Sequence, residues 1–398
     1  MDRIHAIDAI RGLCLIFIFV NHITLGFLHN FSLINIMFSD AADVFIFLAG
    51  IASFLAYGPK LGERYTRANT IKIWRRARLL FWVNSVIAIV SIMILLVGDA
   101  VAPASAPTNL PGHLIETHGA ATYLWHVLTM QQTAGYSVVL RLYVALMLLA
   151  PLYVWLASKR FWYPLLPAGA IWLSAGHFGW VESNSLSGVP LSLTILPWNL
   201  IFAAGISFGA ARAQGITLYK SNVLILAAAA LVAAGPICAT ILTRISPDVL
   251  AWVDTRNDFF WTGASKTFQS PLRVSYMLAL IYLCVNLRDA PLIRFFHQAT
   301  ADSILSRLGR SSLEVFSAGA IMALAANHLL WFLFSNAIVQ PNSALSILIE
   351  MGITSAAVFA MVRIADTNSL RFAAIGPVIR SFLVRTTSPS RPPRAGPS

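Results

Sequence analysis

The stretch IDAIRGLCLIFIFVNHITLGF, residues 7–27, is apolar enough to enter a lipid bilayer, yet it carries Asp8, Arg11 and His22. Arg11 and His22 are separated by about three helical turns plus roughly 20°, so their side chains share one face, ~16 Å apart along the axis. Asp8, one turn before Arg11, lies on the same face. Ionisable groups inside a membrane normally face the protein interior or a water-filled cavity. The stretch therefore predicts a membrane-spanning helix with a functional stripe.

The composition extends this prediction to a polytopic membrane protein. Of the 398 residues, 58% are apolar and 11% are charged, whereas soluble domains carry about 25% charged residues. Apolar runs of membrane-spanning length recur along the chain, and the mean hydropathy is +0.72. We expect an all-α integral membrane protein, a polytopic bundle of about ten transmembrane helices. The expected spans are residues 9–28, 42–58, 79–98, 138–157, 162–177, 191–211, 221–243, 272–287, 312–334 and 344–362.

The positive charge indicates the orientation of the chain rather than a nucleic-acid partner. The net charge is +12, and most Lys and Arg residues fall in segments that are cytoplasmic if the N-terminus is inside. This positive-inside pattern predicts that both termini are cytoplasmic. We expect one membrane domain over residues 1–380 and a disordered cytoplasmic tail rich in Pro and Ser over 381–398. Four of the expected outer segments contain no Lys or Arg: residues 29–41, 99–137, 178–190 and 335–343.

His22 and two aspartates expected at a similar depth form the first candidate site. A neutral imidazole in a protein cavity can accept the proton of a hydroxyl group. In FSDAADVFIFLAG, residues 38–50, Asp40 and Asp43 stand at the outer end of the second span, where a carboxylate would orient the imidazole and stabilise its cation. Asp40 serves equally well as a helix N-cap, and the alternative for the whole stripe is a buried salt bridge beside a packed histidine. We predict His22, Asp43 and Asp40 as catalytic residues.

A cluster of arginines is the second candidate site. In WRRARLL, residues 74–80, Arg75, Arg76 and Arg78 stand at the cytoplasmic mouth of the third span. Guanidinium groups gathered in this way suit phosphate groups. For any one of the three, anchoring the helix at the membrane surface is an equally good explanation.

Two cations on the outer side form the third candidate site, because they go against the general distribution of charge. Lys266 and Arg273 lie in SKTFQSPLRV, residues 265–274, and they predict binding of an acidic acyl group or substrate. The alternative is an ion pair with Asp254 or Asp258. The chain contains no HExxH or CxxC motif and its histidines are scattered, so we expect no metal and no tightly bound cofactor.

Several stretches resemble, in order along the chain, those of a known family. IDAIRGLCLIFIFVNHI looks like the first helix of the membrane acyltransferase-3 superfamily, in which an Arg is followed, after ten intervening residues, by a His, here Arg11 and His22. FSDAADVFIFLAGIASFLAYG resembles the second-helix motif of that superfamily, and RRARLL the basic start of its third helix. Three further stretches make the chain similar to the OpgC family, named for succinyl transfer to osmoregulated periplasmic glucans: RLYVALMLLAP, SKTFQSPLRVSYMLALIYL and LGRSSLEVFSAG.

The resemblance implies a multi-pass protein of the bacterial inner membrane. It implies a membrane O-acyltransferase that takes a succinyl or acetyl group from cytoplasmic acyl-CoA, the donor substrate, and transfers it to a hydroxyl of a periplasmic glucan or other polysaccharide. His22 then corresponds to the catalytic histidine, as general base or as transient acyl carrier. The rival class is a transporter or flippase of a small solute or glycolipid, which would use the buried Arg, His and Asp stripe.

On the acyltransferase hypothesis the cations divide between the two substrates. The CoA is bound by Arg11, Arg75, Arg76 and Arg78. The free carboxylate of a succinyl group is bound by Lys266 and Arg273. The expected partners are thus the lipid bilayer, acyl-CoA and a periplasmic carbohydrate.

Overall fold

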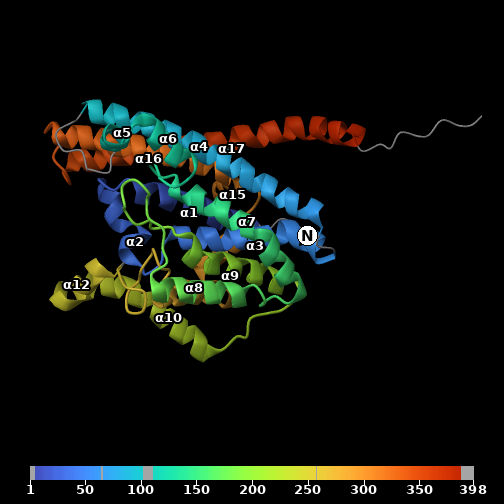
Figure 1. The fold of residues 1–398 in the computed structure, drawn as a ribbon. Helices are drawn as coiled ribbons and strands as arrows, with labels where there is room; N and C mark the ends of the chain where they lie inside the picture. Colours follow the sequence, from blue (N-terminus) through green and yellow to red (C-terminus); the bar gives the residue numbers. More distant parts are fainter. Residues whose placement is uncertain (1–4, 64–65, 102–110, 257, 387–398) are drawn as a thin grey trace, which may run out of the picture.

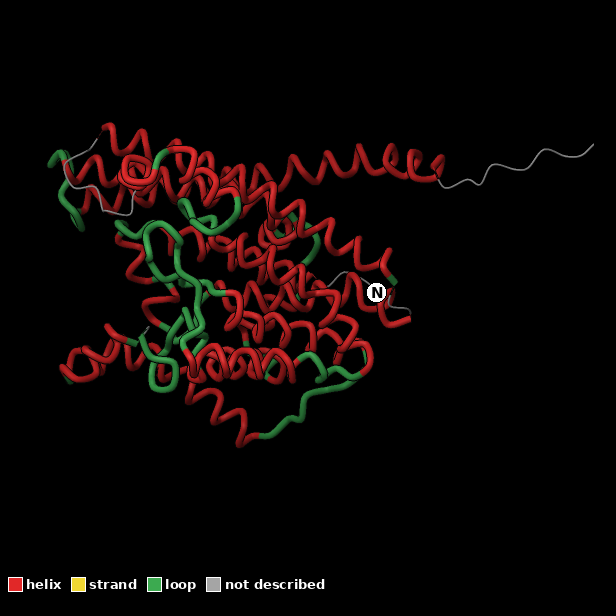
Figure 2. The backbone as a smooth tube through the Cα atoms, in the orientation of Figure 1, coloured by secondary structure: helices red, strands yellow, loops and turns green. Residues whose placement is uncertain are grey.

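The computed structural model is a bundle of helices, several of which run side by side along one direction (Figure 1). Loops gather mainly at the end of the bundle that carries α2 and α12, here called the loop-rich end, opposite the N-terminus (Figure 2). The structure describes residues 5–63, 66–101, 111–256 and 258–386. Within them, the helices of the first half are α1 (His5–His22), η1 (Phe27–Phe31), α2 (Leu33–Ile36), α3 (Ala41–Glu63), α4 (Arg67–Val101), α5 (Pro111–His118), α6 (Ala120–Leu128), α7 (Val138–Lys159) and α8 (Leu165–Phe178). Those of the second half are α9 (Ile195–Ala213), α10 (Asn222–Ile237), η3 (Cys238–Leu242), α11 (Thr243–Ile245), α12 (Pro247–Thr255), α13 (Pro271–Asn286), α14 (Pro291–His297), α15 (Ile304–Arg310), α16 (Ser312–Ser335) and α17 (Ala344–Thr386).

The helices confirm an all-α polytopic membrane protein, with fewer full spans than the sequence predicts. Among the described residues, eight helices are long and apolar enough to cross a membrane, and α13 with α14, bent by 75°, makes a ninth. The span expected at 162–177 corresponds to α8, which begins only after Pro164 and has 14 residues. Such a helix reaches about 21 Å, less than the ~30 Å of hydrocarbon. Of the tail expected at 381–398, residues 381–386 continue α17 and the rest lies outside the described residues.

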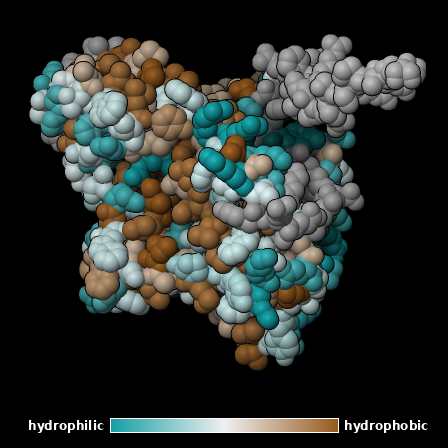
Figure 3. All heavy atoms as spheres, turned by 45° about the vertical axis from the view of Figure 1, so that its right-hand side comes forward, coloured by the Kyte–Doolittle hydropathy of each residue, from teal (hydrophilic) through white to brown (hydrophobic). Residues whose placement is uncertain are grey.

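The surface of the bundle is that of a protein in contact with lipid. Apolar side chains dominate the middle of the face shown in Figure 3, and hydrophilic ones are more frequent toward its two sides. On α10, for example, Val223 and Leu226 are 76% and 72% exposed. A soluble monomer rarely exposes apolar patches of this extent. The multi-pass membrane prediction is therefore confirmed by the structure itself.

The first helix runs parallel to α16, so one helix pair connects the two ends of the predicted stripe. Ser312, at the start of α16, contacts Arg11, and Asn327, farther along α16, contacts His22. Helix α15 packs against another side of α1. A Cβ at Gly12 would overlap the carbonyl oxygen of Leu305, so the two helices meet there without intervening side chains. Small residues at such contacts allow close helix packing in a membrane.

Helices α3 and α9 also meet backbone to backbone, through glycines. A Cβ at Gly50 would overlap the carbonyl oxygen of Phe202, and one at Gly205 would overlap that of Phe47. Gly205 and Gly209 have the spacing of a GxxxG packing motif. The stretch 205–209, GISFG, also fits the Gly-x-Ser-x-Gly pattern, but a nucleophile elbow needs a strand-to-helix turn, and this stretch lies inside α9. Its glycines therefore serve packing.

Gly205→Leu should destabilise the protein strongly, because no room exists for a side chain between α3 and α9. We expect a loss of about 3 kcal/mol or more, since overpacking forces backbone shifts, and a correspondingly lower melting temperature in detergent. Gly169→Leu is the matched control, since a Cβ there meets nothing within 4 Å. Equal melting temperatures for the two variants would contradict the packing argument.

Candidate functional site

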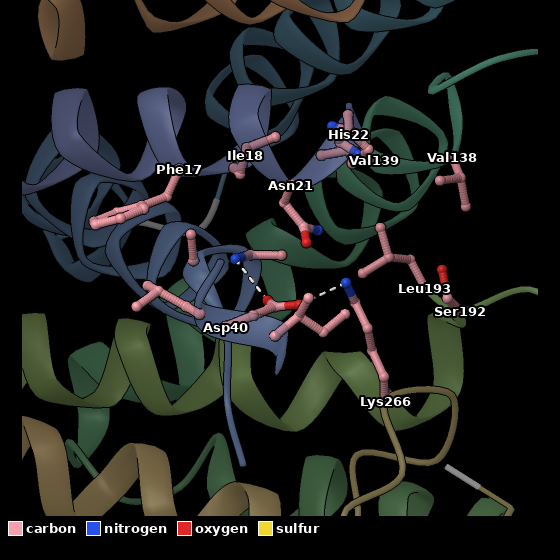
Figure 4. A pocket seen from close by; sticks show the side chains of 14 residues that line it. Phe17, Ile18, Asn21, His22, Asp40, Val138, Val139, Ser192, Leu193 and Lys266 are labelled. Atoms are coloured by element: carbon pink, nitrogen blue, oxygen red, sulfur yellow. Dashed lines mark hydrogen bonds and ion pairs between the residues drawn. The ribbon is translucent and has the colours of Figure 1, made fainter. Parts of the chain in front are cut away.

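A small cavity lies where the end of α1 meets the start of α3, the start of α7 and the loop before α13 (Figure 4). Its volume is about 50 Å³, enough for a few water molecules, so a substrate must widen it. In Figure 4, Asn21 lies between His22 and the pair formed by Asp40 and Lys266, and Ser192 lines the cavity beside Lys266. The structure thus brings together three predicted residues, His22, Asp40 and Lys266, from distant parts of the chain.

Asp40 is both a helix cap and a member of an ion pair. Its Oδ1 accepts the Ala42 N–H at 2.8 Å, at the start of α3. Its Oδ2 lies 2.6 Å from Lys266 Nζ and 3.2 Å from Arg273 Nη2. Burial raises the pKa of the Asp40 carboxyl, but Lys266 and Arg273 outweigh that effect, so this pKa lies below its ordinary value. Asp40 therefore faces the cavity as a charged carboxylate and caps α3, as one interpretation of the sequence predicted, while its catalytic role stays a prediction.

Asp43 is completely buried, and its partners use both of its oxygens. Arg273 donates from Nε to Oδ1 at 3.2 Å and from Nη2 to Oδ2 at 2.5 Å. Gln269 Nε2 donates to Oδ1 at 2.6 Å, and Ser39 Oγ and the Asp40 N–H donate to Oδ2 at 3.0 and 2.8 Å. A carboxylate offers about four lone-pair sites. Asp43 therefore forms an interior ion pair with Arg273. The sequence predicted instead that Asp43 orients the imidazole of His22.

Lys266 and Arg273 take different positions although the sequence predicted one role for both. The Arg273 side chain is 3% exposed and also donates to the carbonyl of Phe38 at 3.3 Å, so it lies beneath the cavity wall. The Lys266 side chain is 14% exposed and lines the cavity. They pair with the carboxylates of Asp43 on α3 and of Asp40 just before it. Two cations and two carboxylates form a cluster with a formal charge of zero.

The loop that carries Lys266 is held in place by hydrogen bonds from side chains of α8 and of the start of α9. Trp198 Nε1 donates to the Lys266 carbonyl at 3.0 Å, and Thr194 Oγ1 donates to the next carbonyl. Trp172 Nε1 donates to the Gln269 carbonyl at 2.6 Å. Gln269 itself has φ +48°, a backbone conformation that the surrounding contacts must hold. Such a clamped loop fixes the position from which Lys266 reaches the cavity.

Two residues that the sequence did not single out contact His22. The ring centroid of Tyr136 lies 3.9 Å from that of the imidazole, and Tyr136 and Asn327 both donate to the His22 carbonyl. Asn327 is an uncharged polar residue inside an expected span, which is the signal that would have found it. Tyr136 lies just before a span, where the sequence offers no such signal.

Arg11 lies on α1 toward the N-terminal end of the bundle. Its Nη2 donates to Ser312 Oγ at 2.9 Å, and its Cζ stands 5.5 Å from the centroid of the Phe45 ring. Its Nε is buried and has no hydrogen-bond partner among the described residues. These contacts leave donor capacity for an anionic ligand, as the sequence-based role requires.

The three arginines of α4 lie at the same end of the bundle as the N-terminus, away from the cavity. Arg75 and Arg78 are exposed and Arg76 is half-buried. In the part of the chain that the structure describes, no hydrogen bond or ion pair engages them. They therefore form a free cationic surface on the N-terminal half of α4, at the opposite end of the bundle from the loop-rich end.

A known protein family matches nearly the whole described bundle. The family described as OpgC protein matches residues 3–367. Comparison with curated proteins and with solved structures gave no match. The matched range includes α1 with Arg11 and His22, the clamped loop and the long α16. The chain therefore belongs to the OpgC family.

Proposed function

We propose that this OpgC-family protein is a membrane O-acyltransferase of the bacterial inner membrane. It moves an acyl group, succinyl or acetyl, from cytoplasmic acyl-CoA to a hydroxyl of a periplasmic glucan or other polysaccharide. The observation that supports this proposal is the small cavity at the end of α1, where His22, Asn21 and Lys266 meet inside an apolar bundle. Polar and ionisable groups at such depth are costly and mark functional sites.

In the proposed reaction His22 acts on the acceptor. One nitrogen of the imidazole accepts the proton of the sugar hydroxyl. At the same time the oxygen of that hydroxyl bonds to the thioester carbonyl carbon. The tetrahedral intermediate then expels the CoA sulfur, which takes the proton from the imidazolium. The products are an O-acyl ester and free CoA thiol, and His22 returns to its neutral form.

Lys266 is proposed to contact the acyl group. Its ammonium lines the cavity and is held by Asp40 at 2.6 Å, so it is fixed in place before substrate arrives. It can bind the free carboxylate of a succinyl group or stabilise the oxyanion of the intermediate. Arg273, which is buried against Asp43, supports this arrangement from beneath and does not meet the substrate.

Donor binding is proposed to begin on α4. The free guanidinium groups of Arg75, Arg76 and Arg78 attract the phosphates of CoA, and Arg11 binds the CoA within the bundle. The thioester then has to reach His22, ~16 Å farther along α1. An extended arm such as that of CoA is long enough to make both contacts at once.

Replacing Arg75, Arg76 and Arg78 together with Gln should raise KM for the acyl-CoA donor by about tenfold or more, the effect of ~1.4 kcal/mol of lost binding. The value of kcat should change little, because these residues lie far from the cavity. Arg212→Gln is the matched control, since it removes an exposed arginine at the same end of the bundle, at the end of α9. A donor KM that rises equally in the control would contradict a specific phosphate site.

The direct test of the function uses purified protein in liposomes, with labelled succinyl-CoA or acetyl-CoA inside and glucan oligosaccharides outside. We expect label on the oligosaccharide, with a mass increment that identifies the acyl group. Passage of unmodified oligosaccharide or free solute across the bilayer without acylation would overturn the proposal in favour of a transporter.

A further inference from the structure

The carbonyl of His22 ends α1 and is bound from outside its own helix. The last carbonyls of a helix have no partner within the helix. Here Tyr136 Oη donates to the His22 carbonyl at 2.5 Å, and Asn327 Nδ2 donates to the same oxygen. Two elements far apart in the sequence, the segment before α7 and the middle of α16, thus meet at this one atom.

Asn327 bonds several polar groups at and just after the end of α1. Its Oδ1 accepts the Leu25 N–H at 3.3 Å and the Thr24 hydroxyl at 3.4 Å, while its Nδ2 bonds the His22 carbonyl. The same Nδ2 donates to Tyr136 Oη at 2.8 Å. The side-chain amide therefore replaces the backbone partners that the next helical turn would have provided. The chain can then leave the helix directly after His22 with the His22 carbonyl and the Leu25 N–H both bonded.

Tyr136 adds a restraint on the imidazole ring itself. Its ring is tilted by 33° against that of His22, with the centroids 3.9 Å apart. One face of the imidazole is thus covered. Burial raises the pKa of Tyr136 to about 12, so the hydroxyl remains protonated and keeps donating at neutral and moderately alkaline pH. The helix end and the ring orientation are restrained by the same side chain.

We propose that Tyr136 and Asn327 are the positioning residues of His22, fixing both the last turn of α1 and the direction in which the imidazole faces the cavity. This inference rests on the proposed function, since it assigns the pair a role in acyl transfer. Neither residue lines the cavity, so both act through His22 rather than on the substrate. A base held in a fixed geometry saves the reorganisation that a mobile base would need.

The kinetic test compares Tyr136→Phe and Asn327→Ala with a matched tyrosine elsewhere. Tyr153→Phe removes a buried hydroxyl that donates to Asn199 at 2.6 Å, away from the cavity. With succinyl-CoA and glucan oligosaccharides, we expect kcat to fall by about tenfold to a hundredfold in the two test variants, with both KM values within about twofold of wild type. Tyr136→Phe should lose less than Tyr136→Leu, because Phe keeps the ring contact. Unchanged kcat in Tyr136→Phe and Asn327→Ala, or an equal loss in Tyr153→Phe, would overturn the proposal.

Hydrogen exchange tests the same contacts without any assay of activity. Within residues 23–28, the Leu25 amide should exchange at least about fivefold faster in Asn327→Ala, because opening no longer has to break its bond to Asn327 Oδ1. The same segment should exchange at the wild-type rate in Tyr153→Phe. If wild type transferred no acyl group, the proposed function would fail, while faster exchange would still support the positioning of His22. Wild-type exchange in Asn327→Ala would overturn the positioning, whatever the activity.

Discussion

His22→Ala should reduce acyl transfer by about a hundredfold to ten-thousandfold, the usual contribution of a general base, while the protein remains folded in the membrane. His22 lines the cavity, and removing its imidazole leaves the hydroxyl of the acceptor without a group that takes its proton. The measurement is the initial rate of label transfer from acyl-CoA to glucan oligosaccharide, with melting temperature recorded for each variant. Because Tyr136 and Asn327 bind the backbone of residue 22, the helix end should survive the substitution.

His328→Ala is the matched control for this experiment. His328 is a second histidine in the bundle, on α16, and it lines a separate groove with Gly98 and Trp331. Its removal should leave the rate within about twofold of wild type, as for substitutions away from a site. Activity retained in His22→Ala would remove the proposed mechanism.

Mass spectrometry of wild type with acyl-CoA alone separates the two roles of His22, general base and acyl carrier, since only an acyl carrier gains the acyl mass.

Arg273→Met should cost about 3–5 kcal/mol of stability, because it leaves a buried carboxylate without its cation. Asp43 is completely buried, and Arg273 holds both of its oxygens. The expected result is a large fall in melting temperature or a loss of folded protein after extraction. Arg307→Met is the matched control: its partner is Asp366 at 2.8 Å, but the two side chains are 30% and 33% exposed. Such an exposed pair contributes about 0–1 kcal/mol.

The double variant Asp43→Asn with Arg273→Met gives the second half of this test. It removes the cation and the charge of its main partner together, so it should recover part of the stability that Arg273→Met loses. The single substitution Arg273→Lys keeps a charge but lacks the two-pronged geometry, and should fall between wild type and Arg273→Met. A double variant less stable than Arg273→Met would contradict the ion-pair account.

The sequence predicted the fold and part of the site, because both depend on local properties. Hydropathy located the helices, and the spacing of Arg11 and His22 on one helix predicted their common face. It failed for the fifth span, where two prolines leave only the short α8. The partners of Asp43 could not be predicted, since Arg273 comes 230 positions later and only tertiary packing brings them together. The proposed substrate contacts remain predictions for Lys266 and for the arginines of α4.

The position of Arg11 and His22 on one continuous helix makes their separation a fixed length. Helix α16 touches both ends of that length, through Ser312 and through Asn327, so α1 cannot stretch or unwind independently. One residue added or removed between the two would rotate one side chain by about 100° relative to the other and change their separation by ~1.5 Å. The helix thus sets the distance between the two side chains, and the number of residues between Arg11 and His22 is as important to the site as the side chains themselves.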